Sequence, residues 1–181
     1  MKRAFLLLML AISGISILPL PCHAGPTGWR SVGIRGGGGT ADVDTFYLYE
    51  GFAAYQLPWG WRGDSGWRIS TQAAISAGVL EGEGDSGFIS TIGPSFPFGK
   101  AGFPLEGDVG VSVAFLSRDT FGNRDYNGNA QFVSHIGLTY RLGSRWGLGY
   151  RFQHMSNAGL NGSRNPGINM HLIGVSWFLM Q

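Results

Sequence analysis

Residues 146–177 read WGLGYRFQHMSNAGLNGSRNPGINMHLIGVSW, and this stretch decides between the folds open to the chain. In its first half, every second residue lies on one side of an extended strand, because successive β side chains point to opposite faces. That side carries Trp146, Leu148, Tyr150, Phe152, His154 and Ser156. Two reactive side chains therefore follow an apolar, aromatic stripe. The stripe would face the core of a soluble protein, or the lipid around a membrane barrel.

The composition of the 181 residues favours strands over helices. Glycine accounts for 31 residues, and charged residues make up only 13%, about half of their usual share in soluble proteins. Interior glycines disfavour helices but suit strands that bend around a narrow lumen, and aromatic residues, also 13%, suit the girdles of membrane barrels. The formal net charge of +2, without a basic run, gives no support for a nucleic-acid partner.

The first 24 residues are typical of an export signal. Lys2 and Arg3 precede an apolar run from Ala4 to Leu18, and we expect cleavage after Ala24, which leaves residues 25–181 as one barrel domain. A membrane-anchoring helix is the alternative, but the run is shorter than the ~20 residues that span a bilayer. Cleavage removes the only cysteine, and this excludes disulfides, a thiolate nucleophile and Cys-ligated metals.

The mature chain divides into alternating segments separated by turn-forming residues. No apolar run reaches the ~18 residues of a membrane helix. We expect eight strands, at 29–36, 43–57, 67–79, 88–98, 103–115, 129–142, from Trp146 onward, and from Ile168 to the C-terminus. Between them we expect a glycine turn at 36–39, a connection at 58–64, an acidic loop at 80–87 and a polar loop at 117–128. Pairing of neighbours predicts an all-β fold, an eight-stranded antiparallel transmembrane β-barrel.

The alternation also predicts which side chains face the lumen. Glu106 and Asp108 lie opposite the apolar side chains of their segment, and a carboxylate facing lipid would cost several kcal/mol. His135 faces the lumen on the same register, with Glu106 or Arg141 as its expected partner. A soluble eight-stranded cup of opposite polarity is the alternative, and the low charge, the aromatic content and the export signal favour the membrane barrel. Eight strands leave no room for an aqueous channel.

His154 and Ser156 lie near the outer end of their strand if the N-terminus is periplasmic. Both are on the face that the apolar stripe assigns to lipid, where polar groups cost stability and are usually functional. Histidine can accept the hydroxyl proton of serine and so make its oxygen a nucleophile for an acyl carbonyl. By itself, the His-x-Ser spacing is a weak motif.

The neighbouring residues strengthen this interpretation. The motif HMSNAG at 154–159, followed by NPGI at 165–168, resembles the signature of the outer-membrane lipid A 3-O-deacylase (PagL) family. The preceding YRFQ at 150–153 is similar as well. The resemblance implies an ester hydrolase of the Gram-negative outer membrane that removes the 3-position acyl chain of lipid A. The alternative function is a non-enzymatic structural or adhesive barrel.

The same resemblance implies roles for individual residues. Ser156 would be the nucleophile and His154 the general base. Asn157, Gly159 and Asn165 would lie near the reacting carbonyl, where the Gly159 N–H or the Asn165 amide would stabilise the oxyanion.

Asn169 departs from the family pattern, which has a glutamate to orient the histidine. An asparagine can hold one tautomer of an imidazole, but it cannot neutralise the imidazolium that forms. Loss of the acid costs a factor of ~10⁴ in the serine-protease case. We therefore expect hydrolysis that is slow, that uses another carboxylate, or that is absent.

The remaining polar residues are expected to have ordinary structural roles. His171 shares the face of Asn169, and we expect it to bond to a neighbour. No His, Asp and Glu group has metal-ligand spacing, so we predict no metal and no other cofactor. The acidic residues at 81–85 are expected to be solvated. The expected partners are lipid A and the surrounding outer-membrane lipid, and the sequence leaves a homodimer open.

Overall fold

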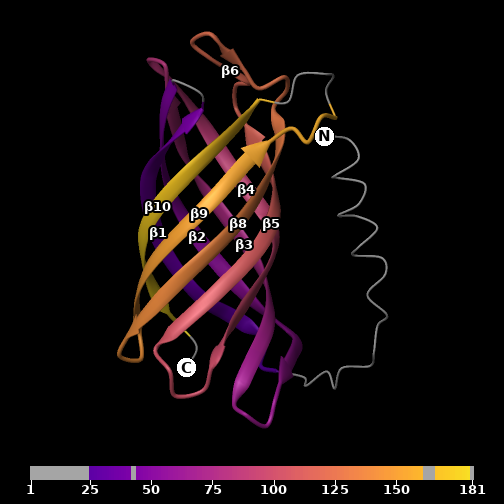
Figure 1. The fold of residues 1–181 in the computed structure, drawn as a ribbon, viewed down its shortest axis with the longest axis vertical. Coiled ribbons are helices and arrows are strands. Elements are labelled where there is room, and N and C mark those ends of the chain that lie inside the picture. The colour runs from indigo at the N-terminus through magenta and orange to yellow at the C-terminus, as the bar shows by residue number, and fades with distance from the viewer. Residues whose placement is uncertain (1–24, 42–43, 161–165, 180–181) are drawn as a thin grey trace.

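The computed structural model describes residues 25–41, 44–160 and 166–179, so the expected signal peptide lies outside the described residues. Eight long antiparallel strands close into a barrel in the order β1-β10-β9-β8-β5-β4-β3-β2 (Figure 1). They are β1 Gly28–Ala41, β2 Asp44–Arg62, β3 Trp67–Gly82, β4 Asp85–Lys100, β5 Leu105–Leu116, β8 Ala130–Leu142, β9 Trp146–Ser156 and β10 Gly167–Phe178. The short strands β6 Thr120–Phe121 and β7 Arg124–Asp125 form a separate hairpin. The predicted eight-stranded barrel is confirmed.

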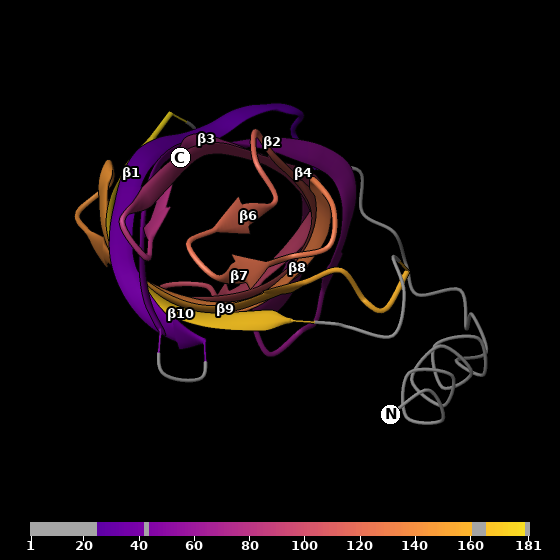
Figure 2. The same ribbon diagram turned by 90° about the horizontal axis from the view of Figure 1, so that it is seen from above.

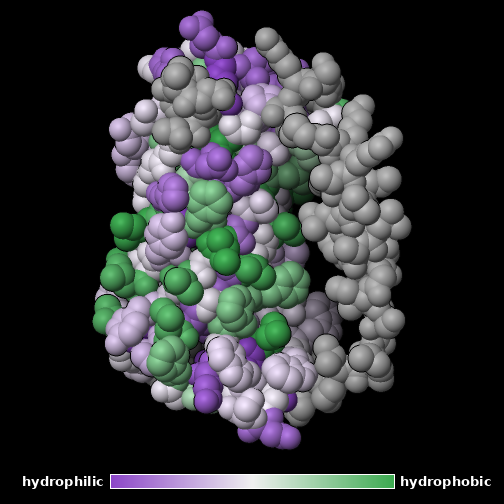
Figure 3. Space-filling model, viewed as in Figure 1, coloured by the Kyte–Doolittle hydropathy of each residue, from purple (hydrophilic) through white to green (hydrophobic). Residues whose placement is uncertain are grey.

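The outer surface carries an apolar belt. On β8, Phe132, Ile136 and Leu138 are 41%, 54% and 49% exposed, whereas the alternate residues Gln131 and His135 are buried. Figure 3 shows hydrophobic residues gathered across the middle and lower part of the face formed by β8, β9 and β10. A soluble cup would have the opposite polarity, so the belt indicates a surface in contact with lipid. In the described part of the chain, no helix is long and apolar enough to cross a membrane.

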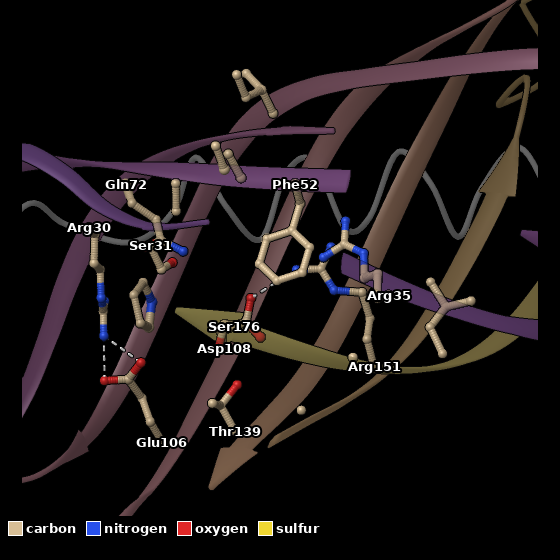
Figure 4. Close-up of a pocket in the computed structure, with 18 of the residues that line it drawn as sticks. Arg30, Ser31, Arg35, Phe52, Gln72, Glu106, Asp108, Thr139, Arg151 and Ser176 are labelled. Atoms are coloured by element: carbon tan, nitrogen blue, oxygen red, sulfur yellow. Dashed lines mark hydrogen bonds and ion pairs between the residues drawn. The ribbon is translucent and has the colours of Figure 1, made fainter. Parts of the chain in front are cut away.

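The lower lumen is filled by paired charges. Arg30 donates to Glu106 at 2.6 Å (Figure 4), and Arg35 donates to Glu50 at 2.5 Å. Arg30, Arg35 and Glu106 point inward from β1 and β5, and the alternation predicts this direction for Glu106. Since buried charges are stable only when they are paired and hydrogen-bonded, the pairing explains how a narrow lumen holds them.

His135 faces the lumen as predicted, but its predicted partner is wrong. Its Nε2 atom lies 2.8 Å from Oδ2 of Asp108, rather than beside Glu106 or Arg141. Glu106 is already held by Arg30, while the Arg141 guanidinium lies 3.5 Å from the centroid of the Phe178 ring. Register accounts for the difference, because Gly110 on β5 pairs with His135 and brings Asp108 within reach.

The upper mouth is closed by residues 117–129, here called the capping segment. Seen from above, β6 and β7 lie within the outline of the ring of long strands (Figure 2), and Figure 1 shows this hairpin at the upper end of the barrel. Phe121 and Tyr126 are fully buried, and both rings pack edge-on against Phe46 of β2, with centroids 6.1 and 6.0 Å away. The sequence predicts a polar loop here, and its two aromatic residues instead complete an apolar core. This core explains why the apolar side chains of Met170 and Leu172 on β10 point inward.

The glycine stretch is the main error in the predicted strands. Gly36 to Gly39 were expected to form a turn, but β1 continues through them to Ala41. A Cβ atom on Gly39 would overlap the carbonyl oxygen of Asn169 on β10. Glycine is therefore required for the close approach of β1 to β10, rather than for a reversal of the chain.

Two expected loops are also shorter than predicted. The acidic loop at 80–87 is a tight hairpin in which only Glu83 and Gly84 separate β3 from β4. Both have positive φ, 53° and 81°, which matches the turn geometry that suits the twist of antiparallel strands. The long connection expected at 58–64 shrinks because β2 continues to Arg62, with a register shift between Gln56 and Gly60.

The close approach at Gly39 predicts the effect of a single methyl group. We expect Gly39→Ala to lower the free energy of unfolding by about 1–3 kcal/mol, because the added Cβ meets backbone that cannot move without breaking the β1–β10 ladder. Urea unfolding of the protein in lipid vesicles measures this change. Gly51→Ala on β2 is the matched control, since the nearest atom to its Cβ is 3.9 Å away. Equal stability of the two variants would contradict the expectation.

Candidate active site

The candidate residues lie where β9 ends and β10 begins, near the capped mouth of the barrel. Asn169 pairs with His154, and Gly167 pairs with Ser156 as the last pair of this ladder. The alternation along β9 places His154 and Ser156 on the outer face, the orientation on which the sequence interpretation depends. Asn169 is exposed, His154 is half-buried and Ser156 is 8% exposed.

His154 and Asn169 are joined by a hydrogen bond across the two strands. Nδ1 of the imidazole lies 2.8 Å from Oδ1 of the amide. An amide oxygen can only accept, so the proton of the neutral imidazole is on Nδ1. Nε2 is therefore left with a lone pair, as a general base requires.

The edge of the imidazole that carries Cε1 and Nε2 lies beside Gly167, which pairs with Ser156 across the two strands. A Cβ atom built on Gly167, the register partner of Ser156, would lie 2.7 Å from Cε1 and 3.3 Å from Nε2 of His154. The ring therefore rests over Gly167, one strand away from the serine. Within the described residues, no hydrogen bond joins the Ser156 hydroxyl to this ring, so direct proton transfer requires the two side chains to move closer together.

The chain turns sharply directly after Ser156. Ala158 and Gly159 have positive φ, 54° and 76°, and the Leu160 N–H donates to the Asn157 carbonyl at 3.1 Å. Asn157 holds this turn, because its Oδ1 accepts from the Gly159 N–H at 2.8 Å and its Nδ2 donates to the Tyr126 carbonyl at 3.2 Å. The Asn157 side chain is thus buried beneath the turn, and the Gly159 N–H already has an acceptor. Asn165 lies outside the described residues.

His171 does not join this group. Its Nδ1 lies 2.7 Å from the hydroxyl of Tyr150, and its ring packs against Phe152 with centroids 5.1 Å apart. This is the neighbour-bonded arrangement expected from the sequence. In the part of the chain that is described, no three His, Cys, Asp or Glu side chains gather closely enough to hold a metal ion.

Sequence reasoning missed three residues around the site. Ser134 of β8 is the register partner of His154 on its other side and is exposed on the same face. It interrupts the apolar alternation of β8, a signal that could have revealed it. Arg124 and Tyr126 reach the site from the capping segment, and only the two aromatic residues of that polar segment hinted at such packing.

Together these groups could support nucleophilic chemistry at a serine. A hydroxyl, a base with a fixed tautomer and a residue that orients the base are the three parts of such a site. Among the described residues no carboxylate bonds to His154, and the orienting group is an amide.

Comparisons with known proteins were made with this geometry in hand. A family model described as "Lipid A 3-O-deacylase (PagL)" matches residues 49–178. The crystal structure of the outer membrane enzyme PagL is similar, with 22% identity, a TM-score of 0.71, and coverage of 81% of this chain and 97% of that chain. No curated protein sequence gives a significant match.

Two further solved structures share the barrel. A de novo designed transmembrane β-barrel has 14% identity and a TM-score of 0.51, over 86% of this chain and 99% of that one. The N-terminal β-barrel domain of Pseudomonas aeruginosa OprF has 18% identity and a TM-score of 0.50, over 84% of this chain and 99% of that one. At such identities the structural likeness supports the fold alone.

The packing of His154 over Gly167 predicts the effect of a methyl group at that position. We expect Gly167→Ala to displace the imidazole and to slow labelling of Ser156 by a fluorophosphonate, a probe of activated serines, by about tenfold or more. Mass spectrometry of the labelled peptide gives the rate. Gly149→Ala, whose Cβ would meet only ordinary contacts from 3.5 Å outward, is the control. Labelling of Gly167→Ala at the unaltered rate would show that the ring does not depend on this contact.

Proposed function

The chain belongs to the lipid A 3-O-deacylase (PagL) family, whose model spans more than half of it, and we propose that Ser156 and His154 carry out the hydrolysis. As a member of this family the protein is an outer-membrane barrel enzyme that hydrolyses an ester of lipid A. The observation that carries the proposal is the bond from His154 to Asn169, which leaves Nε2 free beside the strand position of Ser156.

The proposed reaction proceeds through an acyl-enzyme. The Ser156 oxygen attacks the carbonyl of the 3-position ester while Nε2 of His154 takes the hydroxyl proton. Collapse of the tetrahedral intermediate breaks the bond to the sugar oxygen, which leaves with that proton. A water molecule, activated by the same nitrogen, then releases the fatty acid and restores the serine.

The surface below the site suits an acyl chain. Leu148, Tyr150 and Ile173 are 50%, 44% and 64% exposed, and they continue the apolar face from the site toward the middle of the barrel. An acyl chain in the outer leaflet can lie along this wall, which places its ester at the rim beside Ser156. In this proposal the membrane itself holds the substrate against the enzyme, so little of the substrate needs a pocket.

Two groups near Ser156 are candidate donors to the oxyanion. The sequence motif offers the Gly159 N–H and the amide of Asn165, and the Gly159 N–H already donates to Asn157. The tetrahedral oxyanion would have to compete with the Asn157 side chain for that donor. Of the two alternatives that the motif offers, we therefore favour the amide of Asn165.

Loss of one hydroxyl tests the proposed nucleophile. Expression of the protein in a Gram-negative outer membrane should reduce the mass of lipid A by one 3-position acyl group, and Ser156→Ala should abolish this change. Mass spectrometry of extracted lipid A is the measurement. Ser134→Ala removes the other hydroxyl next to His154 and is the matched control, with activity retained. Unaltered lipid A with the parent protein would instead favour the non-enzymatic barrel.

Replacing the neutral orienting residue should accelerate the reaction. Asn169→Asp keeps the side-chain length and the 2.8 Å contact with Nδ1 but adds the charge that stabilises an imidazolium. We expect kcat for lipid A to rise by about tenfold or more, since loss of such a charge costs far more than that in serine proteases. A rate that is unchanged in a correctly folded variant would mean that orientation of the ring is all the enzyme uses.

A further inference from the structure

We propose that the capping segment is a positioning element of the active site, acting through the Arg124 side chain and the Tyr126 carbonyl. The inference rests on the function proposed above for His154 and Ser156. The segment contacts Asn157, which follows Ser156 in the chain, and Gly167, which pairs with Ser156 on β10. Both contacts are made from the lumen side of the barrel wall. Neither Arg124 nor Tyr126 lies on the lipid-facing surface where the substrate would bind.

The first contact fixes the surface on which the imidazole rests. Nη2 of Arg124 donates to the carbonyl oxygen of Gly167 at 2.9 Å. Gly167 is the register partner of Ser156, and the His154 ring lies over it. A charged donor holding this carbonyl therefore limits how far the start of β10 can move beneath the imidazole.

The second contact fixes the turn that follows the serine. The Tyr126 carbonyl accepts from Nδ2 of Asn157 and from Nε2 of Gln131, both at 3.2 Å. The Tyr126 ring is fully buried against Phe46 and Phe121, so this carbonyl is held by the apolar core. Asn157 in turn accepts from Gly159, and the chain leaving Ser156 is anchored through Tyr126.

The β9–β10 ladder ends at this position. Ser156 and Gly167 form the last pair between β9 and β10, and strand ends are the places where sheets fray. The capping segment is also secured on the opposite wall, where the Gly122 N–H donates to Asp85 at 2.8 Å, while the ion pair of Asp85 with Arg118 is exposed and adds little. It thus ties β4 to the ends of β9 and β10 across the mouth, and replaces the support that a longer ladder would give.

A charge near the rim could instead attract the phosphates of lipid A, and the test must separate the two effects. Arg124→Lys keeps the charge but loses the planar guanidinium geometry, and Arg124→Gln loses both. Arg118→Gln removes a charge from the same rim, while the Gly122 N–H still holds the segment to Asp85. Each variant would be assayed with lipid A and with a short neutral ester that has no phosphate, in the same detergent.

Positioning predicts a specific pattern. Both Arg124 variants should lose about tenfold in kcat on both substrates, with KM within about twofold, because the reacting groups are misplaced rather than the substrate unbound. Arg118→Gln should keep both constants within about twofold of the parent protein. Thermal unfolding of the barrel should be unchanged in all three variants, which excludes a general loss of structure.

Three results would overturn the inference. Full activity of Arg124→Lys would make charge, not geometry, the property that matters. A loss confined to lipid A, shared with Arg118→Gln, would assign Arg124 to attraction of phosphate. Unaltered kcat in Arg124→Gln would remove the role altogether. Failure of the proposed function is distinct from all of these, since the parent protein would then be as inactive as Ser156→Ala.

Discussion

The pairing of β1 with β10 is the constraint on which the rest of the structure depends. It joins the first and last strands from Ser31 and Phe178 up to Thr40 and Asn169, and so leaves no unpaired edge in the lipid. Because strand side chains alternate with a period of two, a slip of one residue would turn His154 and Asn169 into the lumen. The glycines of β1 permit this closure, and their value lies in the close approach they allow rather than in flexibility.

The lumen has two parts with different consequences for the outer wall. Its lower part holds buried carboxylates bonded to basic side chains, such as Glu106 to Arg30 and Asp108 to His135. Its upper part is an apolar core completed by Phe121 and Tyr126. The candidate site lies outside this upper part, so the strands that carry it are backed by packed side chains rather than by water. Such backing limits the movement of side chains that must stay within hydrogen-bond reach.

Much of the fold could be predicted because the strands of a membrane barrel alternate between apolar side chains that face lipid and smaller or polar ones that face the lumen. The faces of β8, β9 and β10 follow from that contrast, and two alternating strands in register place Asn169 beside His154. The glycines at 36–39 have no side chains that could alternate in polarity, so the sequence did not indicate that β1 continues through them. The capping segment packs on Phe46, far away along the chain. The bond from Arg124 to Gly167 joins a side chain to a backbone atom 43 residues away, and such contacts leave no pattern.

Compared with a carboxylate, the amide of Asn169 leaves the arrangement of the resting site unaltered. The difference concerns the protonated state of His154 in the proposed reaction. Amide and carboxylate oxygens both accept from Nδ1, so the ground state has the same tautomer with either residue. In the proposed reaction they differ only once His154 has taken a proton, when a carboxylate would attract the imidazolium and an amide would contribute a dipole. Glu50, Glu106 and Asp108 are paired with arginine or histidine inside the barrel, and the wall separates them from the outer face. Beside lipid, where charges are weakly screened, an imidazolium is costly, so in the proposed mechanism we expect the effect of Asn169 to fall on kcat rather than on substrate binding.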